Sequence, residues 1–253
     1  MSVPSRTVNG MGPGPMDTLE LFDRPEWAET IGVFDLETTG IDVRTDRIVT
    51  AHVGLLDREG NVLESRAWMA DPGIDIPAGA TAVHGITTER ARAEGRPAPV
   101  VVAEIVDALR ALFERGIAVV AYNAPFDFSL LKYEAERHGT EPIHAPAPVI
   151  DPLVLDRAVD RYRRGKRTLD LVAAHYSVEL IGAHEAAADA VAAGRVALAL
   201  AERYGGRLPA AGAELHTRQI GWAREQAESL TAYFVKIGRI DAADPVDGRW
   251  PIR

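Results

Sequence analysis

The most restrictive feature of the sequence is a succession of three apolar runs near its start. They cover residues 30–36, 47–57 and 61–69. The last two runs are separated by Asp57-Arg58-Glu59-Gly60, which has the composition of a hairpin turn. The three runs therefore predict an antiparallel meander of three strands, and the segments that follow decide which sheet the meander belongs to.

Helices and short strands alternate after the meander. The candidate helices cover residues 100–115, 125–138, 168–175 and 185–204, and the candidate strands cover 117–122 and 149–150. The Pro/Gly-rich stretch 71–88 is expected to be a loop, and Asp151-Pro152 is expected to cap and begin a further helix. This order of elements predicts an α/β domain with a mixed sheet, in which the meander is joined by parallel strands and flanked by helices.

The two ends of the sequence differ from this domain, which we place at residues 28–204. Residues 1–27 are rich in Gly, Pro and Ser and predict a flexible N-terminal arm. Residues 205–253 predict a linker and an amphipathic helix that folds back on the core, with a partner-binding helix as the alternative. The apolar stripe of this helix consists of Ile220, Ala223, Ala227, Leu230, Phe234 and Ile237.

Composition excludes several classes of site. The chain of 253 residues has no cysteine, so disulfides, thiolate nucleophiles and cysteine-ligated metals are excluded and any metal is expected to be hard. A net charge of −9 argues against a protein that coats nucleic acid, but it permits a local site where cations lie between carboxylates and phosphates. Neither a long apolar run nor a signal peptide is evident, which predicts a cytoplasmic protein without membrane contact.

Two acidic residues close the first apolar run. The two-residue period of a strand places Asp35 and Glu37 on one face and Phe34 and Leu36 on the other. Two carboxylates at the end of a buried strand repel each other unless a cation holds both ionised, and magnesium suits this position because it prefers carboxylate oxygens. Taken alone, the pair is more typical of a solvent-facing strand end.

Two later segments carry acids that can join this pair. Asp127 lies in the first turn of the helix after strand 117–122, where the helix dipole alone also favours an acid. His184 and Asp189 are five positions apart, which on a helix separates two side chains by about 140°. If the helix begins after His184, Asp189 can bind a metal while the histidine lies over the site as a general base for neutral pH.

Together these segments resemble the DEDDh family of 3′-to-5′ exonucleases, and within it the type of the proofreading epsilon subunit of bacterial DNA polymerase III. The resemblance covers residues 31–204. It rests on three ordered motifs, Val33–Gly40, Tyr122–Asp127 and His184–Asp189, with weaker matches at Ala82–Thr87 and Thr168–Leu171. Tyr122 departs from the family pattern, in which many members have histidine.

The resemblance implies a ribonuclease H-like fold and a two-metal site. It assigns Asp35, Glu37, Asp127 and Asp189 as ligands of two Mg²⁺ ions, for which Mn²⁺ can substitute, and His184 as the general base. The residues that it implies for holding the terminal nucleotide are Thr38, Thr39, His84, Asn123 and Phe126. A place in the core is the alternative for Phe126.

Two further features bear on partners. A basic run is predicted to steer the phosphate backbone, with a solvated helix end and loop as the alternative; it comprises Arg157, Arg161, Arg163, Arg164, Lys166 and Arg167. Residues 18–22, Thr-Leu-Glu-Leu-Phe, faintly resemble the motif with which replication proteins dock on the sliding clamp. The candidate partners are therefore nucleic acid 3′ ends, DNA polymerase III and the clamp.

The expected function is a metal-dependent 3′-to-5′ exonuclease that releases nucleoside 5′-monophosphates from DNA 3′ ends during proofreading or repair. An enzyme that processes RNA 3′ ends, similar to oligoribonuclease or ribonuclease T, remains open because the metal site acts on the phosphodiester and does not read the 2′-hydroxyl. A non-catalytic polymerase accessory is a third class. Retention of all five expected active-site positions argues against it.

Overall fold

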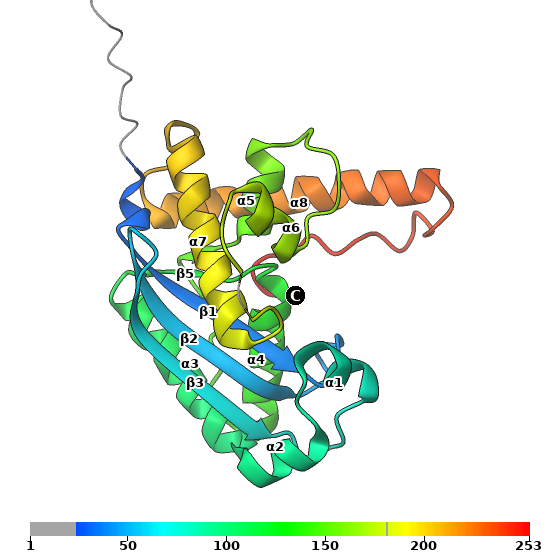
Figure 1. Cartoon of the computed structure of the whole chain (residues 1–253). Coiled ribbons are helices and arrows are strands. Elements are labelled where there is room, and N and C mark those ends of the chain that lie inside the picture. The colour runs from blue at the N-terminus through cyan, green and yellow to red at the C-terminus, as the bar shows by residue number, and fades with distance from the viewer. Residues whose placement is uncertain (1–23, 181) are drawn as a thin grey trace, which may run out of the picture.

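A six-stranded mixed sheet forms the centre of the computed structural model, which describes residues 24–180 and 182–253 (Figure 1). The strands are β1 (Thr30–Thr38), β2 (Ile48–Asp57), β3 (Val62–Asp71), β4 (Arg96–Pro97), β5 (Ala118–Val120) and β6 (Val149–Ile150), in the spatial order β4-β3-β2-β1-β5-β6. β1, β2 and β3 form the predicted antiparallel meander, whereas β5 and β6 continue the sheet parallel to β1. The predicted fold class is confirmed.

Helices cover both faces of the sheet. One face carries α3 (Ala98–Glu114) and α4 (Pro125–His138), and the other carries α7 (Ala186–Tyr204) (Figure 1). β1 alternates between the two cores: Phe34 and Leu36 pack on the α3/α4 side, and Ile31 and Val33 pack on the α7 side. Because Asp35 and Glu37 continue the second series, the period of the strand directs both acids toward α7.

The helix boundaries follow local capping chemistry. α4 begins at Pro125 and ends at Gly139, whose φ of 70° gives the left-handed cap that glycine tolerates without strain. Asp151 caps α5 (Pro152–Val159), accepting a hydrogen bond from the backbone N of Leu153 at 3.0 Å. α6 (Leu169–His175) begins after Thr168, as expected. Each of these helix ends therefore lies at a proline, glycine, aspartate or threonine that was recognisable in the sequence.

The prediction of a loop over residues 71–88 was wrong. The segment contains α1 (Ala78–His84) and the first residue of α2 (Thr88–Glu94), which leads into the two-residue edge strand β4. The residues that indicated a loop, Pro77 and Gly85, are the two caps of α1, and Gly85 has a φ of 74°. Short capped helices and loops share this composition, so the pattern could not separate them.

The two ends of the structure depart from the predicted boundaries. Trp27 is buried in a short 3₁₀ helix, Glu26–Ala28, so residues 24–27 belong to the folded domain rather than to the arm. Residues 1–23 lie outside the described residues. Within the predicted linker, a 3₁₀ turn, Gly205–Arg207, precedes α8 (Gly212–Lys236).

α8 folds back on the domain with the middle of the predicted stripe: Ala227 is buried, and Ala223, Leu230 and Phe234 are half-buried. Its buried residues are Leu215, Gln219 and Ala227, whereas Ile220 and Ile237 of the predicted stripe are 44% and 52% exposed. The N-terminal half of α8 packs on β6 and α5, and the rest projects beyond the sheet before the chain returns along it (Figure 1). No helix within residues 24–180 and 182–253 is both long and apolar enough to cross a membrane.

Candidate active site

Three predicted carboxylates meet at the carboxyl-terminal end of β1. Asp35 and Glu37 extend from β1, and Asp189 extends from the first turn of α7, which packs against this face of the sheet. One carboxylate oxygen of each lies within 4.8 Å of the other two. Oxygens at this spacing can share a cation, so the fold assembles an acidic cluster from distant parts of the chain.

Asp127 lies beside this cluster. It is buried in the first turn of α4, and its Oδ1 accepts a hydrogen bond from the backbone N of Leu36 at 3.1 Å. This bond ties α4 to β1 between the two acids of the strand. The negative charge of Asp127 raises the pKa of Asp35, so the four acids form one electrostatic unit.

Burial raises the pKa of every acid in this unit, and the charges of other acids in the unit raise the pKa of Asp35, Glu37 and Asp127 further. For Asp35 the largest cause is burial, followed by the charges of Asp127, Glu37 and Asp189. Burial and the neighbouring Asp189 raise the pKa of Glu37 to about 7. Burial also raises the pKa of Asp127 and of Asp189. A hard divalent cation would remove this cost because it supplies the missing positive charge, and the all-carboxylate donor set fits Mg²⁺ or Mn²⁺.

His184 precedes α7 rather than lying on it, as predicted. Its φ of 69° is left-handed, and the helix begins two residues later at Ala186. The backbone N of His184 donates a long hydrogen bond of 3.3 Å to Oδ2 of Asp189. The backbone of His184 is thus held next to the acidic cluster, while its imidazole remains exposed.

His84 and His184 line the same cavity as Glu37. This cavity measures about 420 Å³, and Trp68, Ile86 and Arg90 also contribute to it. The Nδ1 of His84 accepts a hydrogen bond from the backbone N of Ile86 at 3.1 Å, and Nε2 is buried beside the backbone of Thr38. Burial lowers the pKa of His84, so its ring is neutral at pH 7.

With this geometry, the chain can be compared with known proteins. An exonuclease family model matches residues 33–197, a range that contains the four acids and both histidines of the cavity. The chain belongs to this exonuclease family. The resemblance that the motifs predicted is therefore confirmed.

Relatives of this exonuclease include PolC-type DNA polymerases III of bacteria. It is 32% identical over 171 residues to the PolC-type DNA polymerase III of Lacticaseibacillus paracasei, which is 66% of this chain and 11% of the relative. It is 33% identical over 169 residues to the PolC-type polymerase of Streptococcus thermophilus, with the same shares. The exonuclease thus spans about a tenth of the length of the curated relatives that it matches.

Solved structures share the fold. Escherichia coli exonuclease I in complex with a dT13 oligonucleotide matches with a TM-score of 0.61 and 22% identity, over 70% of this chain and 42% of that chain. Exonuclease I of Methylocaldum szegediense matches with a TM-score of 0.59 and 22% identity, over 70% and 41%. At these identities the likeness shows the ribonuclease H-like fold.

The predicted substrate threonines of the exonuclease are engaged within the β1–β2 connection. The hydroxyl of Thr38 donates to the carbonyl of Gly40 at 2.6 Å, and that of Thr39 donates to Oδ1 of Asp46 at 2.9 Å. Both threonines are buried. Their hydroxyls therefore shape the loop beside Glu37, and the backbone N of Thr39 also bonds within it, to the carbonyl of Arg47 at 3.0 Å.

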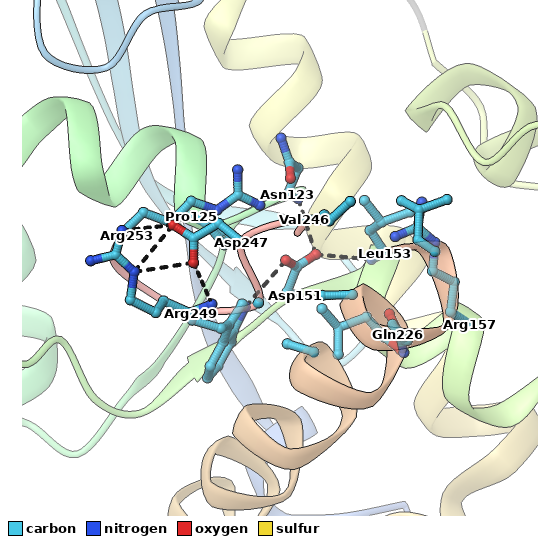
Figure 2. A pocket seen from close by; sticks show the side chains of 16 residues that line it. Asn123, Pro125, Asp151, Leu153, Arg157, Gln226, Val246, Asp247, Arg249 and Arg253 are labelled. Atoms are coloured by element: carbon cyan, nitrogen blue, oxygen red, sulfur yellow. Dashed lines mark hydrogen bonds and ion pairs between the residues drawn. The ribbon is translucent and has the colours of Figure 1, made fainter. Parts of the chain in front are cut away.

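Asn123 and Phe126 lie at the start of α4, next to Asp127. Asn123 has a left-handed φ of 61° and donates its backbone N–H to Oδ1 of Asp151 at 3.0 Å. It lines a small cavity between α4 and α8 (Figure 2). Phe126 packs, partly buried, against the core on the α3/α4 side, which is the alternative that the sequence left open for it.

Two buried groups near the site were not predicted. Asp151 was expected only to cap α5, but it also binds the backbone N of Ala124 at 3.0 Å and so fixes the start of α4. His52 lies directly opposite Asp35 on β2, and neither of its ring nitrogens has a hydrogen-bond partner among the residues that the structure describes. The sequence feature that could have identified His52 is a single histidine within the apolar run 47–57.

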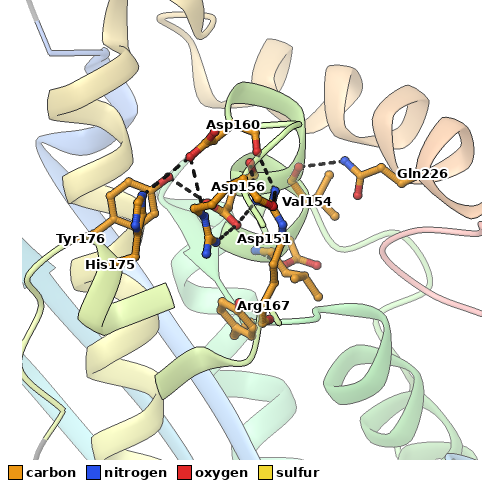
Figure 3. A network of polar contacts seen from close by, with 11 residues as sticks. Asp151, Val154, Asp156, Asp160, Arg167, His175, Tyr176 and Gln226 are labelled. Carbon is orange, nitrogen blue, oxygen red and sulfur yellow. Dashed lines mark hydrogen bonds and ion pairs between the residues drawn. The ribbon is translucent and has the colours of Figure 1, made fainter. Parts of the chain in front are cut away.

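The predicted basic run divides into two groups. Arg163 and Arg167 pair with the buried Asp156, so their assignment to backbone steering was wrong (Figure 3). Tyr176 also binds Asp156, with its hydroxyl 2.8 Å from Oδ1. The exposed members of the run are Arg157, Arg161, Arg164 and Lys166. The clamp-like segment 18–22 lies outside the described residues.

Proposed function

We propose that this exonuclease is a divalent-metal-dependent enzyme that degrades DNA from 3′ ends and releases nucleoside 5′-monophosphates, in proofreading or repair. The observation that carries the proposal is the cluster of Asp35, Glu37 and Asp189, whose oxygens lie within 4.8 Å of one another. Their pKa values are all raised. A fold that gathers like charges at such a cost gains from binding cations there.

In this proposal the four acids hold two ions. Asp35 has the central role because its pKa responds to the charges of Asp127, Glu37 and Asp189. Bound Mg²⁺ or Mn²⁺ supplies positive charge for the scissile phosphate and for the departing 3′ oxygen. The hydrogen bond from Leu36 to Asp127 keeps α4 in register with the acids of β1.

His184 acts as the general base for the attacking water. An exposed imidazole on a turn outside α7 can move toward the phosphate while Asp189 stays fixed in the helix. The neutral ring of His84 lines the same cavity. Together with Asn123 and the loop of Thr38 and Thr39, it positions the terminal nucleotide.

DNA is favoured as the substrate by the relatives. The matched curated proteins are DNA polymerases, and the matched exonuclease I was solved with a dT13 oligonucleotide. Because the matched curated relatives are DNA polymerases, the proposal includes association with a polymerase III or a sliding clamp.

Digestion of matched oligonucleotides tests the proposal. DNA and RNA strands with a 5′ label, single and double stranded, are incubated with Mg²⁺ or with EDTA. A ladder of stepwise shortening on DNA, which EDTA abolishes, is expected. A ladder on RNA alone would instead identify an RNA-processing enzyme. Absence of product under every condition would identify a non-catalytic polymerase accessory.

Asp35→Asn is the decisive variant in this assay. It removes the charge of Asp35, whose pKa all three other acids raise, so exonuclease activity should fall below detection. Asp75→Asn is the matched control, because Asp75 lies at the surface in an ion pair with Arg92. Equal activity of Asp35→Asn and the wild type would refute the site.

A further inference from the structure

A second groove lies between α5, which is within the segment that the exonuclease family model matches, and α8, which is outside it. It measures about 430 Å³ and is lined from α5 by Arg157 and from α8 by Trp222, Gln226 and Tyr233. Arg161, which follows α5, completes its rim. Since α8 begins at Gly212 and the family match ends at residue 197, one wall of the groove lies outside the family match.

Of the three arginines that line this groove, Arg157 and Arg161 are available to a ligand and Arg167 is not. Arg163 and Arg167 neutralise the buried Asp156 (Figure 3). In contrast, Arg157 and Arg161 are exposed and make no ion pair within residues 24–180 and 182–253. Glu225 is the acid that lines the groove. In a chain of net charge −9, two uncompensated arginines mark a local preference for an anion.

Aromatic side chains accompany these arginines. Tyr233 is 56% exposed on the groove wall, and Tyr162, between Arg161 and Arg163 in sequence, is 89% exposed. Trp222 lines the groove, with the guanidinium of Arg218 5.5 Å from its ring centroid. Trp222 is partly buried against the core, whereas the two tyrosines are exposed. Accessible rings beside free arginines are the combination that holds unpaired bases by stacking and the sugar-phosphate backbone by charge.

The groove is continuous with a smaller cavity that reaches the start of α4, the helix that carries Asp127. Arg157, Gln226 and Leu230 line both this groove and the smaller cavity that reaches Asn123 (Figure 2). Asn123 lies four residues before Asp127, whose Oδ1 binds the backbone between Asp35 and Glu37. A flexible polymer whose end lies among the acids can therefore pass over the start of α4 and into the groove.

We propose that the α5–α8 groove binds single-stranded DNA, holding the nucleotides that precede the 3′ end in the active site. The proposal rests on the proposed nuclease function. Arg157 and Arg161 contact phosphates, and Tyr233 and Trp222 stack on bases. The groove would thus give the enzyme a preference for long unpaired strands over very short ones.

Fluorescence anisotropy in EDTA, where no turnover occurs, tests this preference with labelled DNA strands of 5 and 20 nucleotides. For the 20-mer, the pair Arg157→Ala/Arg161→Ala should raise Kd at least tenfold. It should also lower the salt slope by about 1.4, which is about 0.7 for each lost phosphate contact. For the 5-mer, which ends before the groove, Kd should change less than twofold. Tyr233→Ala should weaken 20-mer binding about fivefold or more.

The matched control is Arg110→Ala/Arg115→Ala, which removes the same charge from α3 and the residue after it, on the other face of the sheet. Equal weakening by the two pairs, or an unchanged Kd and salt slope for the groove pair, would overturn the proposal. A change of sedimenting mass in the groove pair would instead identify an interface between copies.

The digestion ladder of the wild type separates this result from the proposed function. If the wild type shortens DNA stepwise but the groove variants bind the 20-mer normally, only the groove assignment fails. If the wild type produces no ladder and binds neither strand, both proposals fail.

Discussion

At the scale of single residues, the separation of His184 from Asp189 divides catalysis from metal binding. His184→Ala should slow DNA hydrolysis by about 10²- to 10⁴-fold, the usual contribution of a general base. The acids remain, so the rise of the unfolding temperature on adding Mn²⁺ should persist. Single-turnover digestion and thermal melts measure the two effects, with His144→Ala, an exposed histidine, as the control. Loss of the Mn²⁺ effect would make His184 a metal ligand or a folding residue.

The raised pKa of Glu37 predicts a pH dependence of the metal-free protein. Its carboxyl titrates at about 7 in the fold and near 4.5 when unfolded, so over this interval the folded state holds more protons. Stability in EDTA should therefore be highest below about pH 4.5 for this group and fall as pH rises to about 7. Asp35 and Asp189, whose pKa values are also raised, act in the same direction.

Thermal melts between pH 5 and pH 8 check this dependence. Glu37→Gln should flatten the decline in EDTA, whereas Glu59→Gln, an exposed glutamate in the β2–β3 turn, should leave it unchanged. Added Mn²⁺ should raise the unfolding temperature more at pH 8 than at pH 5. A wild-type unfolding temperature that rises with pH in EDTA would contradict the electrostatics of the cluster.

Individual residues also mark the limit of sequence reasoning at the site. The acids were predictable because each follows a strand or begins a helix in a recognisable motif. The ion pairs of Arg163 and Arg167 with Asp156 were not predictable, because they depend on where α5 and the loop after it meet. The unpartnered imidazole of His52 is likewise a consequence of strand register, which places it opposite Asp35.

At the scale of elements, Gly194 sets the distance between α7 and the sheet. A methyl group at this position would lie 2.5 Å from Cγ1 of Val33 and 2.7 Å from Cδ1 of Leu56, both in the core below the helix. Gly194→Ala should therefore destabilise the protein by about 1–3 kcal/mol, although alanine favours a helix by about 1 kcal/mol.

Chemical denaturation measures this difference. Gly221→Ala in α8 is the control, because nothing lies within 4 Å of its added methyl group and the change should be neutral or stabilising. Displacement of α7 also moves Asp189, so Gly194→Ala should bind Mn²⁺ more weakly. Equal stability of the two variants would show that α7 can move away from β1 without cost.

The elements were predictable where a period and a cap agreed. The meander has apolar runs separated by a hairpin turn, and the helices over 125–138 and 185–204 are followed by glycine. The structure places α4 and α7 within a residue of the predicted bounds. α1 has seven residues and no apolar stripe long enough to detect, and β4 has two residues paired only with β3. β4 exists because the edge of β3 supplies its partner.

At the scale of the whole molecule, α8 completes the edge of the sheet beyond β6. Gln219 is buried, and its amide group donates to the carbonyl of Val149 at 2.9 Å and accepts from the backbone N of Asp151 at 2.7 Å. Trp250 of the returning C-terminal segment donates to Oδ2 of Asp151 at 3.3 Å. The sequence presented α8 as an appended helix with an apolar stripe, but polar contacts join it to the domain.

Gln219→Met tests whether α8 is a structural part of the exonuclease domain. The substitution keeps the length of the side chain but leaves two buried backbone groups unpaired, at about 1–3 kcal/mol each, so a loss of about 2–5 kcal/mol is expected. Arg218→Met, the exposed neighbour, should change stability by about 0.5 kcal/mol or less. Denaturant unfolding should remain a single transition, because β6 and Asp151 connect α8 to the start of α4 and hence to Asp127. A separate early transition for α8 would show that the helix is an appendage, and the active site would then be independent of it.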